Sequence, residues 1–441
     1  MNENRDRILT DLKRILGQKS LSPSGEGVDE CAKLVSDLCL DYGFDSSEVK
    51  ETEGHPGVIA RKNVSEDAPT ILFFGHYDVQ SVEENKWSSP PFEPEIRDEN
   101  GSERLFARGA GDNKGQFFTH LCAVDMLGDD LEANVVLVLE GEEEKGSPNL
   151  EQILQDENLE DVDVVVCADG SMEVEDIPTI ELGCRGMLYL HLEIETGEEN
   201  LHSGKSSGLM RNAALEISKV LDSLKDDKGK VLVDDFYENV REPSEADFEN
   251  VRDIEERTNF KKEDYHNMGK GIGLEKKYIY PQLNVPGVES GYGSDGAETV
   301  IPSSAEASIG IRMVANQSSS EIREKIEDYI KNVISENADF SLTEIGSVEP
   351  YKADQSSDYV EIIKDVLEDT HGDESLVKPT SSASLPFHKL SDGIGADCIL
   401  VPYANHDENQ HAPDENLKLG LFRKGIICSA KIMEKLGEKE R

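Results

Sequence analysis

The sequence predicts an α/β protein with a mainly parallel central sheet. Short apolar runs alternate with longer stretches of helical periodicity, such as residues 28–42 and 114–127. Strands that are buried on both faces of a parallel sheet have nearly continuous apolar sequences, and helices connect them. The predicted strands of this part of the chain occupy residues 57–60, 71–74, 135–139 and 162–167.

The pattern changes after Arg185 and Gly186. Residues 187–195 alternate apolar and polar side chains, as in a half-exposed strand. We therefore expect a small inserted α+β domain at 186–350, with a charged insertion at about 225–277, while residues 1–185 and 351–441 form the first domain. The other expected elements are a helix at 212–224, a strand at 305–314, a helix ending near 333, a strand at 340–345, a helix at 359–370, an apolar run at 398–401 and a helix at 417–436.

The chain is strongly acidic. Its 441 residues include 92 acidic and 45 basic side chains, for a formal net charge of −47. The charge would repel nucleic acids and anionic membrane surfaces, so we expect neither as a partner. Repulsion within the fold would be screened at molar salt, where the Debye length is about 3 Å. We hypothesise an intracellular protein of a halophile that accumulates salt.

Cysteine usage and the N-terminal segment predict a cytoplasmic protein. The seven cysteines are scattered without CxxC spacing, which is typical of reduced, buried thiols. The segment that ends at Gly17 predicts an amphipathic surface helix and not a signal peptide. No run approaches the roughly 18 apolar residues that a membrane span needs.

His76 follows the predicted strand 71–74 after a single glycine, Gly75. Ligands of parallel α/β sheets gather at the carboxyl ends of the strands, which is where this histidine falls. Asp78 lies on the same side of an extended chain and can accept a hydrogen bond from the second imidazole nitrogen, as the partners of metal-bound histidines do. Taken alone, the pattern also fits a hydrogen-bonded loop histidine.

Two further segments place carboxylates next to predicted elements. Residues 108–115, RGAGDNKG, form a glycine-rich turn with Asp112 before a helix, although turn chemistry alone accounts for the glycines. A phosphate-binding loop would need a different spacing of glycine and lysine. Strand 135–139 runs into EGEEEKGS, where Glu143 and Glu144 lie. A solvated acidic surface is the alternative to a site in which one carboxylate binds metal and its neighbour transfers a proton.

The remaining candidates are Asp169, just after strand 162–167, and His411, in the polar loop NHDENQHAP at 405–413. Each is ordinary by itself. Together, strand-end sites that carry His, Asp, Glu and Asp, and a late His, predict a metal site at one edge of the sheet. Oxygen and imidazole ligands without thiolates suit Zn²⁺, Mn²⁺ or Co²⁺.

The motifs GHYDVQ, ARGAGDNKGQ, EGEEEKGS and HAPDE resemble, in order and spacing, those of the co-catalytic zinc metallopeptidases. This family includes carnosinase-like dipeptidases, carboxypeptidase G, aminoacylase and succinyl-diaminopimelate desuccinylase. The resemblance extends from about residue 20 to residue 436. It implies a zinc-peptidase-like catalytic domain that binds two divalent metal ions, zinc before manganese or cobalt. It also implies that the inserted domain is a ferredoxin-like lid through which a homodimer forms.

The resemblance also implies the ligands of both metal ions. His76, Asp112 and Asp169 would bind the first ion. Asp112 would bridge to a second ion, completed by Glu144 and His411.

The same resemblance assigns roles to residues around the ligands. Glu143 would be the general base that takes a proton from the attacking water and returns it to the leaving amine. Asp78 would orient His76. The peptide bond between Asp112 and Asn113 is expected to be cis.

Three residues of the inserted domain, and Ser384 from the last part of the chain, match substrate contacts of the family. His202, in the sequence LHSG, would reach the active site of the partner subunit and polarise the scissile carbonyl. Arg312 would hold the substrate carboxylate with its bidentate guanidinium. Thr299 and Ser384 match lesser contacts.

Asp169 is the best clue to the substrate, because family members that act on peptides with a free amino end tend to carry Asp at this position. Two features depart from the dipeptidase branch: residues 346–351, GSVEPY, contain no histidine, and Ser382 and Ala383 replace a Gly–Gly pair. We predict hydrolysis of dipeptides or short peptides with a free carboxylate. The alternatives are an N-acyl-amino-acid deacylase, of the acetylornithine deacetylase or succinyl-diaminopimelate desuccinylase type, and a non-catalytic metal-binding relative.

Overall fold

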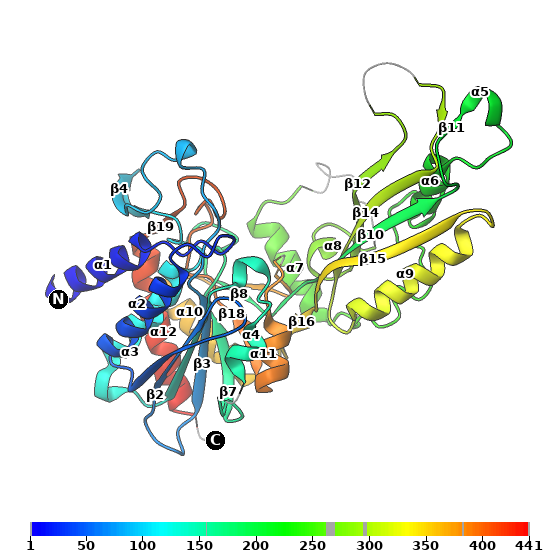
Figure 1. The fold of residues 1–441 in the computed structure, drawn as a ribbon. Coiled ribbons are helices and arrows are strands. Elements are labelled where there is room, and N and C mark those ends of the chain that lie inside the picture. Colours follow the sequence, from blue (N-terminus) through cyan, green and yellow to red (C-terminus); the bar gives the residue numbers. More distant parts are fainter. Residues whose placement is uncertain (1, 156, 262–269, 294–297, 382, 440–441) are drawn as a thin grey trace. The chain divides into compact units, whose positions relative to one another are not determined.

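The computed structural model describes residues 2–155, 157–261, 270–293, 298–381 and 383–439 (Figure 1). Part of the predicted insertion, residues 262–269, and Ser382 lie outside the described residues. The chain forms two compact units. The first comprises Met1–Gly183, Ala353–Lys378 and Pro386–Arg441, and the second comprises Cys184–Lys352 and Pro379–Leu385. The second unit thus includes a short segment, 379–385, that lies outside the 186–350 boundaries expected from the sequence.

An eight-stranded sheet forms the centre of the first unit, with the strand order β1-β2-β6-β3-β7-β18-β8-β17. The four middle strands run parallel to one another. Antiparallel pairs join β1 to β2, β2 to β6 and β8 to β18. The predicted α/β fold with a mainly parallel central sheet is therefore confirmed. The strands are β1 (Ser46–Lys50), β2 (Gly57–Lys62), β3 (Thr70–His76), β6 (Asn134–Glu140), β7 (Val162–Cys167), β8 (Thr179–Glu181), β17 (Leu376–Lys378) and β18 (Asp397–Leu400).

Helices cover both faces of this sheet because its middle strands are buried on both sides. Figure 1 shows α2, α3 and α12 on one side and α4 and α11 on the other. Helix α3 is buried from Lys114 to Val124, since it packs between β3 and α12. The helices of the unit are α1 (Asn2–Gly17), α2 (Val28–Asp41), α3 (Lys114–Leu127), α4 (Leu150–Leu154), α10 (Asp358–His371), α11 (Phe387–Ile394) and α12 (Leu419–Gly437).

The second unit is a four-stranded antiparallel sheet with the order β12-β14-β10-β15, packed on two helices. Its β–α–β–β–α–β series of main elements is β10 (Gly186–Glu195), α6 (Ala213–Ser223), β12 (Gln282–Ser290), β14 (Ser304–Met313), α9 (Ser319–Val333) and β15 (Asp339–Val348). Along β10, buried positions such as Leu188, Leu190 and Leu192 alternate with more exposed ones. The buried face forms a second hydrophobic core with the two helices.

Strand β12 was not predicted from the sequence. It contains Pro286 and Gly287, which are unfavourable inside a regular strand. The structure accommodates them at the edge of the sheet, with a register shift between Asn284 and Gly287. An edge strand has one side without a partner, so it tolerates a residue that has no N–H group.

Several smaller elements complete the described chain. They are β4 (Glu95–Glu99), β5 (Ser102–Phe106), β9 (Gly183–Cys184), β11 (Leu201–His202), β13 (Val300–Ile301), β16 (Tyr351–Lys352), β19 (Asn416–Lys418), α5 (Ser203–Ser206), α7 (Glu245–Arg257), α8 (Glu275–Tyr278) and the 3₁₀ helices η1 (Glu84–Lys86), η2 (Gly128–Asp130) and η3 (Glu143–Lys145). In the described part of the chain, no helix has both the length and the apolar character that a membrane crossing requires.

Candidate metal centre

The candidate site lies at the carboxyl edge of the parallel strands. His76 is the last residue of β3, and Asp169 follows β7 by two residues. Helix η3, which carries Glu143 and Glu144, follows β6 after a short turn. Because β6, β3 and β7 are adjacent and parallel, the segments that follow them emerge at one edge of the sheet.

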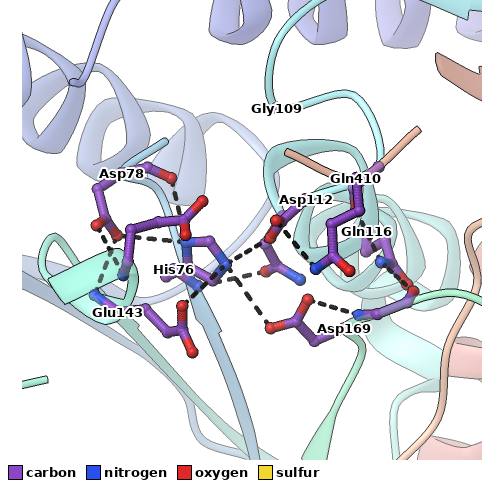
Figure 2. A network of polar contacts seen from close by, with 12 residues as sticks. His76, Asp78, Gly109, Asp112, Gln116, Glu143, Asp169 and Gln410 are labelled. Carbon is purple, nitrogen blue, oxygen red and sulfur yellow. Dashed lines mark hydrogen bonds and ion pairs between the residues drawn. The ribbon is translucent and has the colours of Figure 1, made fainter. Parts of the chain in front are cut away.

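His76, Asp112 and Asp169 form a first cluster of possible ligand atoms. The Nε2 atom of His76 is 3.0 Å from Oδ1 of Asp112 and 3.7 Å from Oδ2 of Asp169. All three residues are buried. Figure 2 shows Asp112 and Asp169 on the same side of the imidazole, with Glu143 on its other side.

Asp112, Glu144 and His411 form a second cluster. The Nε2 atom of His411 is 2.9 Å from Oδ2 of Asp112 and 3.0 Å from Oε2 of Glu144. His411 is half exposed, whereas the carboxylates of Asp112 and Glu144 are buried. Asp112 therefore belongs to both clusters and turns one carboxylate oxygen toward each.

The side chains present fit two divalent cations. Each cluster combines one imidazole nitrogen with carboxylate oxygens, a ligand set suited to Zn²⁺ and similar ions. Within the described residues, the basic partners of Asp112 and Asp169 are histidines, with no lysine or arginine among them. Buried carboxylates this close together need a cation to offset their repulsion and desolvation.

The pKa values reflect this shortage of cations. Burial, opposed in part by His76, raises the pKa of Asp169 to about 7. Burial and the neighbouring carboxylates raise the pKa of Glu143 well above its usual range, despite His76. Hydrogen bonds to Asp112 and Glu144 raise the pKa of His411 to about 10.

Asp78 connects the two strand ends behind the clusters. Its Oδ1 atom is 3.3 Å from Nδ1 of His76, and its backbone oxygen is 3.1 Å from the same nitrogen. The same carboxylate accepts hydrogen bonds from the backbone N–H groups of Glu143, at 3.3 Å, and Glu144, at 3.2 Å. This fully buried side chain thus fixes the imidazole that faces the first cluster and the turn that carries both glutamates.

Glu143 occupies a different position from its two acidic neighbours. Its Oε2 atom lies 4.0 Å from Nε2 of His76, at the margin of the first cluster. Glu144 points to His411, whereas Glu142 turns away and pairs with Lys145 at 2.9 Å. The three consecutive glutamates, 142–144, therefore point to three different partners.

The Asp112–Asn113 peptide is cis, as the family resemblance implied.

Several residues that hold the site were not singled out in the sequence. The side-chain amide of Gln116 donates to the carbonyl oxygens of Gly111 and Gly170, next to the two aspartates of the first cluster (Figure 2). Gln116 lies in the motif ARGAGDNKGQ, but nothing in a linear sequence indicates that its amide spans two loops.

Glu408 is a second residue of this kind. Its side chain is buried against Gly111, and within the described residues neither of its carboxylate oxygens has a hydrogen-bond partner. Burial and the nearby Asp112 and Glu415 raise its pKa well above the usual range. Gly111 is required here, because a Cβ atom at this position would lie 1.8 Å from Oε2 of Glu408.

The second unit contains the four residues that match substrate contacts. Nε2 of His202 lies 3.2 Å from Oγ1 of Thr299, at the paired ends of β11 and β13. Arg312, in β14, donates a hydrogen bond of 3.0 Å to the hydroxyl of Ser384. The structure therefore brings these residues together in two pairs within this unit.

An α/β sheet with two overlapping His–carboxylate clusters at its carboxyl edge is the arrangement of a two-metal hydrolase. The model of peptidase family M20/M25/M40 matches residues 72–435. The chain belongs to this family of peptidases, as the motifs indicated.

Three similar proteins illustrate the relationship. A cysteinylglycine-S-conjugate dipeptidase of Corynebacterium striatum is 29% identical over 438 residues, covering 95% of this chain and 92% of the relative. A beta-Ala-His dipeptidase of Rattus norvegicus is 26% identical over 379 residues, covering 82% of this chain and 76% of the relative. The crystal structure of an M20 family metallo-carboxypeptidase from Sulfolobus solfataricus has a TM-score of 0.82 and 30% identity, covering 98% of this chain and 99% of that one.

Proposed function

We propose that the protein is a two-metal dipeptidase that hydrolyses the peptide bond of dipeptides, or of short peptides, with a free carboxylate. The observation that carries this proposal is the position of Asp112, which is shared by both ligand clusters, with Glu143 beside them. The names of the relatives support a dipeptide substrate. So does Asp169, which stands where deacylases of the family tend to carry glutamate.

His76, Asp112 and Asp169 would hold one ion, and Asp112, Glu144 and His411 the other. We propose zinc, with manganese and cobalt as the other ions that suit these donors. When bound, the two ions would supply Lewis acidity toward the scissile carbonyl and lower the pKa of the attacking water.

Glu143 would carry the proton. As the C–O bond forms, it takes a proton from the attacking water, and as the C–N bond breaks it delivers this proton to the leaving amine. Glu143 lies beside His76 but belongs to neither ligand cluster, so its carboxylate is available for this role.

The tautomer of His202 supports a role in polarising the substrate. The backbone N–H of Gly204 donates to Nδ1 of His202 at 3.0 Å, so in the neutral ring the proton resides on Nε2. Nε2–H can therefore donate a hydrogen bond to a carbonyl oxygen and stabilise the negative charge that develops there. It now faces Thr299, which a substrate oxygen would replace.

Arg312 would bind the free carboxylate of the substrate. Among the described residues its one side-chain hydrogen bond is to the hydroxyl of Ser384, a neutral group, so its charge is available to an anion. Binding of a free carboxylate by Arg312 would favour substrates in which the carboxylate lies close to the bond that is cut, as it does in a dipeptide.

The proposal extends to the oligomeric state, the location and the salt adaptation of the enzyme. We propose a cytoplasmic homodimer in which the second unit acts as a lid and His202 of one subunit serves the active site of the other. The net charge of −47 supports adaptation to high salt.

A substrate panel tests the proposed activity. The purified protein is incubated at high KCl with Zn²⁺, Mn²⁺ or Co²⁺ and with free dipeptides, dipeptides amidated at the C-terminus, longer peptides and N-acetyl-amino acids. We expect turnover of free dipeptides and little of their amides. Hydrolysis of the acylated amino acids alone would overturn the proposal in favour of a deacylase. Release of the last residue of long peptides would instead favour the carboxypeptidase activity named for the Sulfolobus structure.

A further inference from the structure

Glu415 makes four hydrogen bonds to the loop that carries Asp112. Its Oε1 atom accepts from the backbone N–H groups of Gly111, at 2.9 Å, and Asp112, at 3.0 Å. Its Oε2 atom accepts from the N–H of Gly109, at 3.0 Å, and from Nη1 of Arg108, at 2.7 Å. The side chain is fully buried, and among the described residues these four donors satisfy its carboxylate.

The ion pair with Arg108 makes this burial possible. Burial and the nearby Asp112 raise the pKa of Glu415, whereas Arg108 lowers it, because an ionised carboxylate in such surroundings is costly without a cation. The guanidinium of Arg108 is also buried, and its only ion-pair partner in the described chain is Glu415. Charge-assisted hydrogen bonds of this kind are shorter and stronger than neutral ones.

The same residue is tied to the loop of His411. Glu415 follows His411 by four residues and immediately precedes β19, which pairs with β5. The loop that carries His411 includes Asn409, His411 and Asp414 with φ angles of 61°, 56° and 61°. Non-glycine residues adopt this left-handed conformation at an energetic cost, so the surrounding contacts must hold the loop.

We propose that Glu415 is a positioning residue that holds the Asp112 loop and the His411 loop in the register required to bind the second metal ion. The inference rests on the proposed function, since it assumes that Asp112, Glu144 and His411 hold an ion. Glu415 itself lies behind the ligands and acts through the backbone of Asp112.

The variant Glu415→Gln tests this role. Glutamine keeps the size of the side chain but turns an NH₂ donor toward backbone N–H groups, so half of the acceptor capacity is lost. Glu181→Gln is the matched control. Glu181 is also a buried carboxylate of the same unit, at the end of β8. Its Oε1 atom pairs with Nζ of Lys378 at 2.6 Å, and it belongs to neither ligand cluster.

Each protein is stripped with a chelator and titrated with Zn²⁺ at high KCl by calorimetry. We expect two ions per chain for the wild type, and for Glu415→Gln a loss of about 10–100-fold in affinity for one of them, as found for partners of metal ligands. Glu181→Gln should keep both affinities even where its thermal stability falls. At saturating metal, Glu415→Gln should regain most of its kcat.

Two results would overturn the inference. One is a Glu415→Gln protein whose metal affinities equal those of the wild type while its stability falls as in Glu181→Gln, which would make Glu415 merely structural. The other comes from hydrogen exchange of the metal-free wild type, which does not depend on the variant folding: the amides of Gly109, Gly111 and Asp112 should be protected, and rapid exchange there would contradict the proposal. Failure of the proposed function gives a different result, because the wild type itself would then bind no metal.

Discussion

Asp112 and His411 lie 2.9 Å apart, between Oδ2 and Nε2, although the whole second unit lies between them in the sequence. The other oxygen of Asp112 faces His76 at 3.0 Å. One carboxylate thus joins a histidine from the middle of the sheet to a histidine from the last loop. This relationship makes the number of bound metal ions depend differently on each ligand.

We expect Asp112→Ala to bind neither metal ion with high affinity, because it removes a ligand from both clusters. His411→Ala should lose only the second ion, because the first cluster remains intact. Metal content after dialysis, measured by mass spectrometry, checks both. His406→Ala, a change in the same loop outside the ligand clusters, is the control and should keep two ions. Retention of two ions by Asp112→Ala would contradict the bridging role.

Replacement of Glu143 by alanine should remove most activity and leave the metal bound. Loss of general acid–base catalysis lowers kcat by about 10²–10⁴-fold. Glu142→Gln serves as the control, because the neighbouring carboxylate points to Lys145 and away from the site. Steady-state kinetics together with metal content make the test. Unchanged turnover in Glu143→Ala would refute the assigned role.

Mixed dimers test whether His202 acts across subunits. Homodimers of His202→Ala and of Glu143→Ala should each be nearly inactive. If His202 serves the partner, a dimer with one chain of each kind has one complete site. Random mixing of the chains in a two-fold dimer should then restore about a quarter of wild-type activity. If each site is built from a single chain, mixing restores nothing, which would contradict the proposal.

Thermal stability should rise with salt concentration. With a net charge of −47, the folded chain repels itself when the Debye length is about 30 Å, at 0.01 M salt, and much less at about 3 Å, at 1 M. Melting curves followed by the single tryptophan, Trp87, measure this in KCl and NaCl. Screening predicts similar gains in the two salts. Equal melting temperatures from low to molar salt would refute adaptation to a salt-rich cytoplasm.

His120 should make the first unit less stable in mild acid. It is fully buried, stacks on Phe73 and bonds through Nδ1 to the hydroxyl of Ser429 at 2.9 Å. Burial lowers its pKa to about 3. Below pH 6.5, His120 binds a proton in the unfolded chain but stays neutral in the folded chain. The free energy of unfolding therefore falls until the pH reaches about 3.

The expected loss from this histidine between pH 7 and pH 5 is about 2 kcal/mol, because each pH unit below the unfolded pKa costs about 1.4 kcal/mol. Urea unfolding of the wild type and of His120→Asn, followed by Trp87, measures it. The variant should be less stable at pH 7, and its difference from the wild type should narrow by this amount at pH 5. A gap that stays constant would show that His120 does not titrate on unfolding.

The sequence predicted the catalytic sheet well because its signal is local. The apolar runs that became β3, β6 and β7 are continuous, and residues at the ends of adjacent parallel strands must meet. The sequence alone therefore places His76, Asp169 and the glutamates of η3 at one edge of the sheet. Strand β12 was missed because Pro286 and Gly287 break the local pattern, and only pairing with β14 makes this segment a strand.

The contacts of the residues that support the ligands could not be predicted from the sequence. Gln116 and Glu415 lie in recognisable motifs, but their partners are up to 307 residues away in the chain. A buried amide or carboxylate gives no periodic signal, because its placement depends on which loops the fold brings together. Glu408 illustrates the same point: its burial against Gly111 is a property of packing.

The sequence by itself determined the α/β class, the family and the set of residues able to bind metal, since strand ends and motif spacing are properties of short segments. The motif resemblance had also implied that Asp112 bridges the two ions and that Asp78 orients His76. Tertiary structure decided that Asp78 holds the backbone of both glutamates as well, and that Glu415 bonds to the loop that carries Asp112. These relationships depend on contacts between segments far apart in the chain. Long-range packing creates such contacts, and local pattern does not encode them.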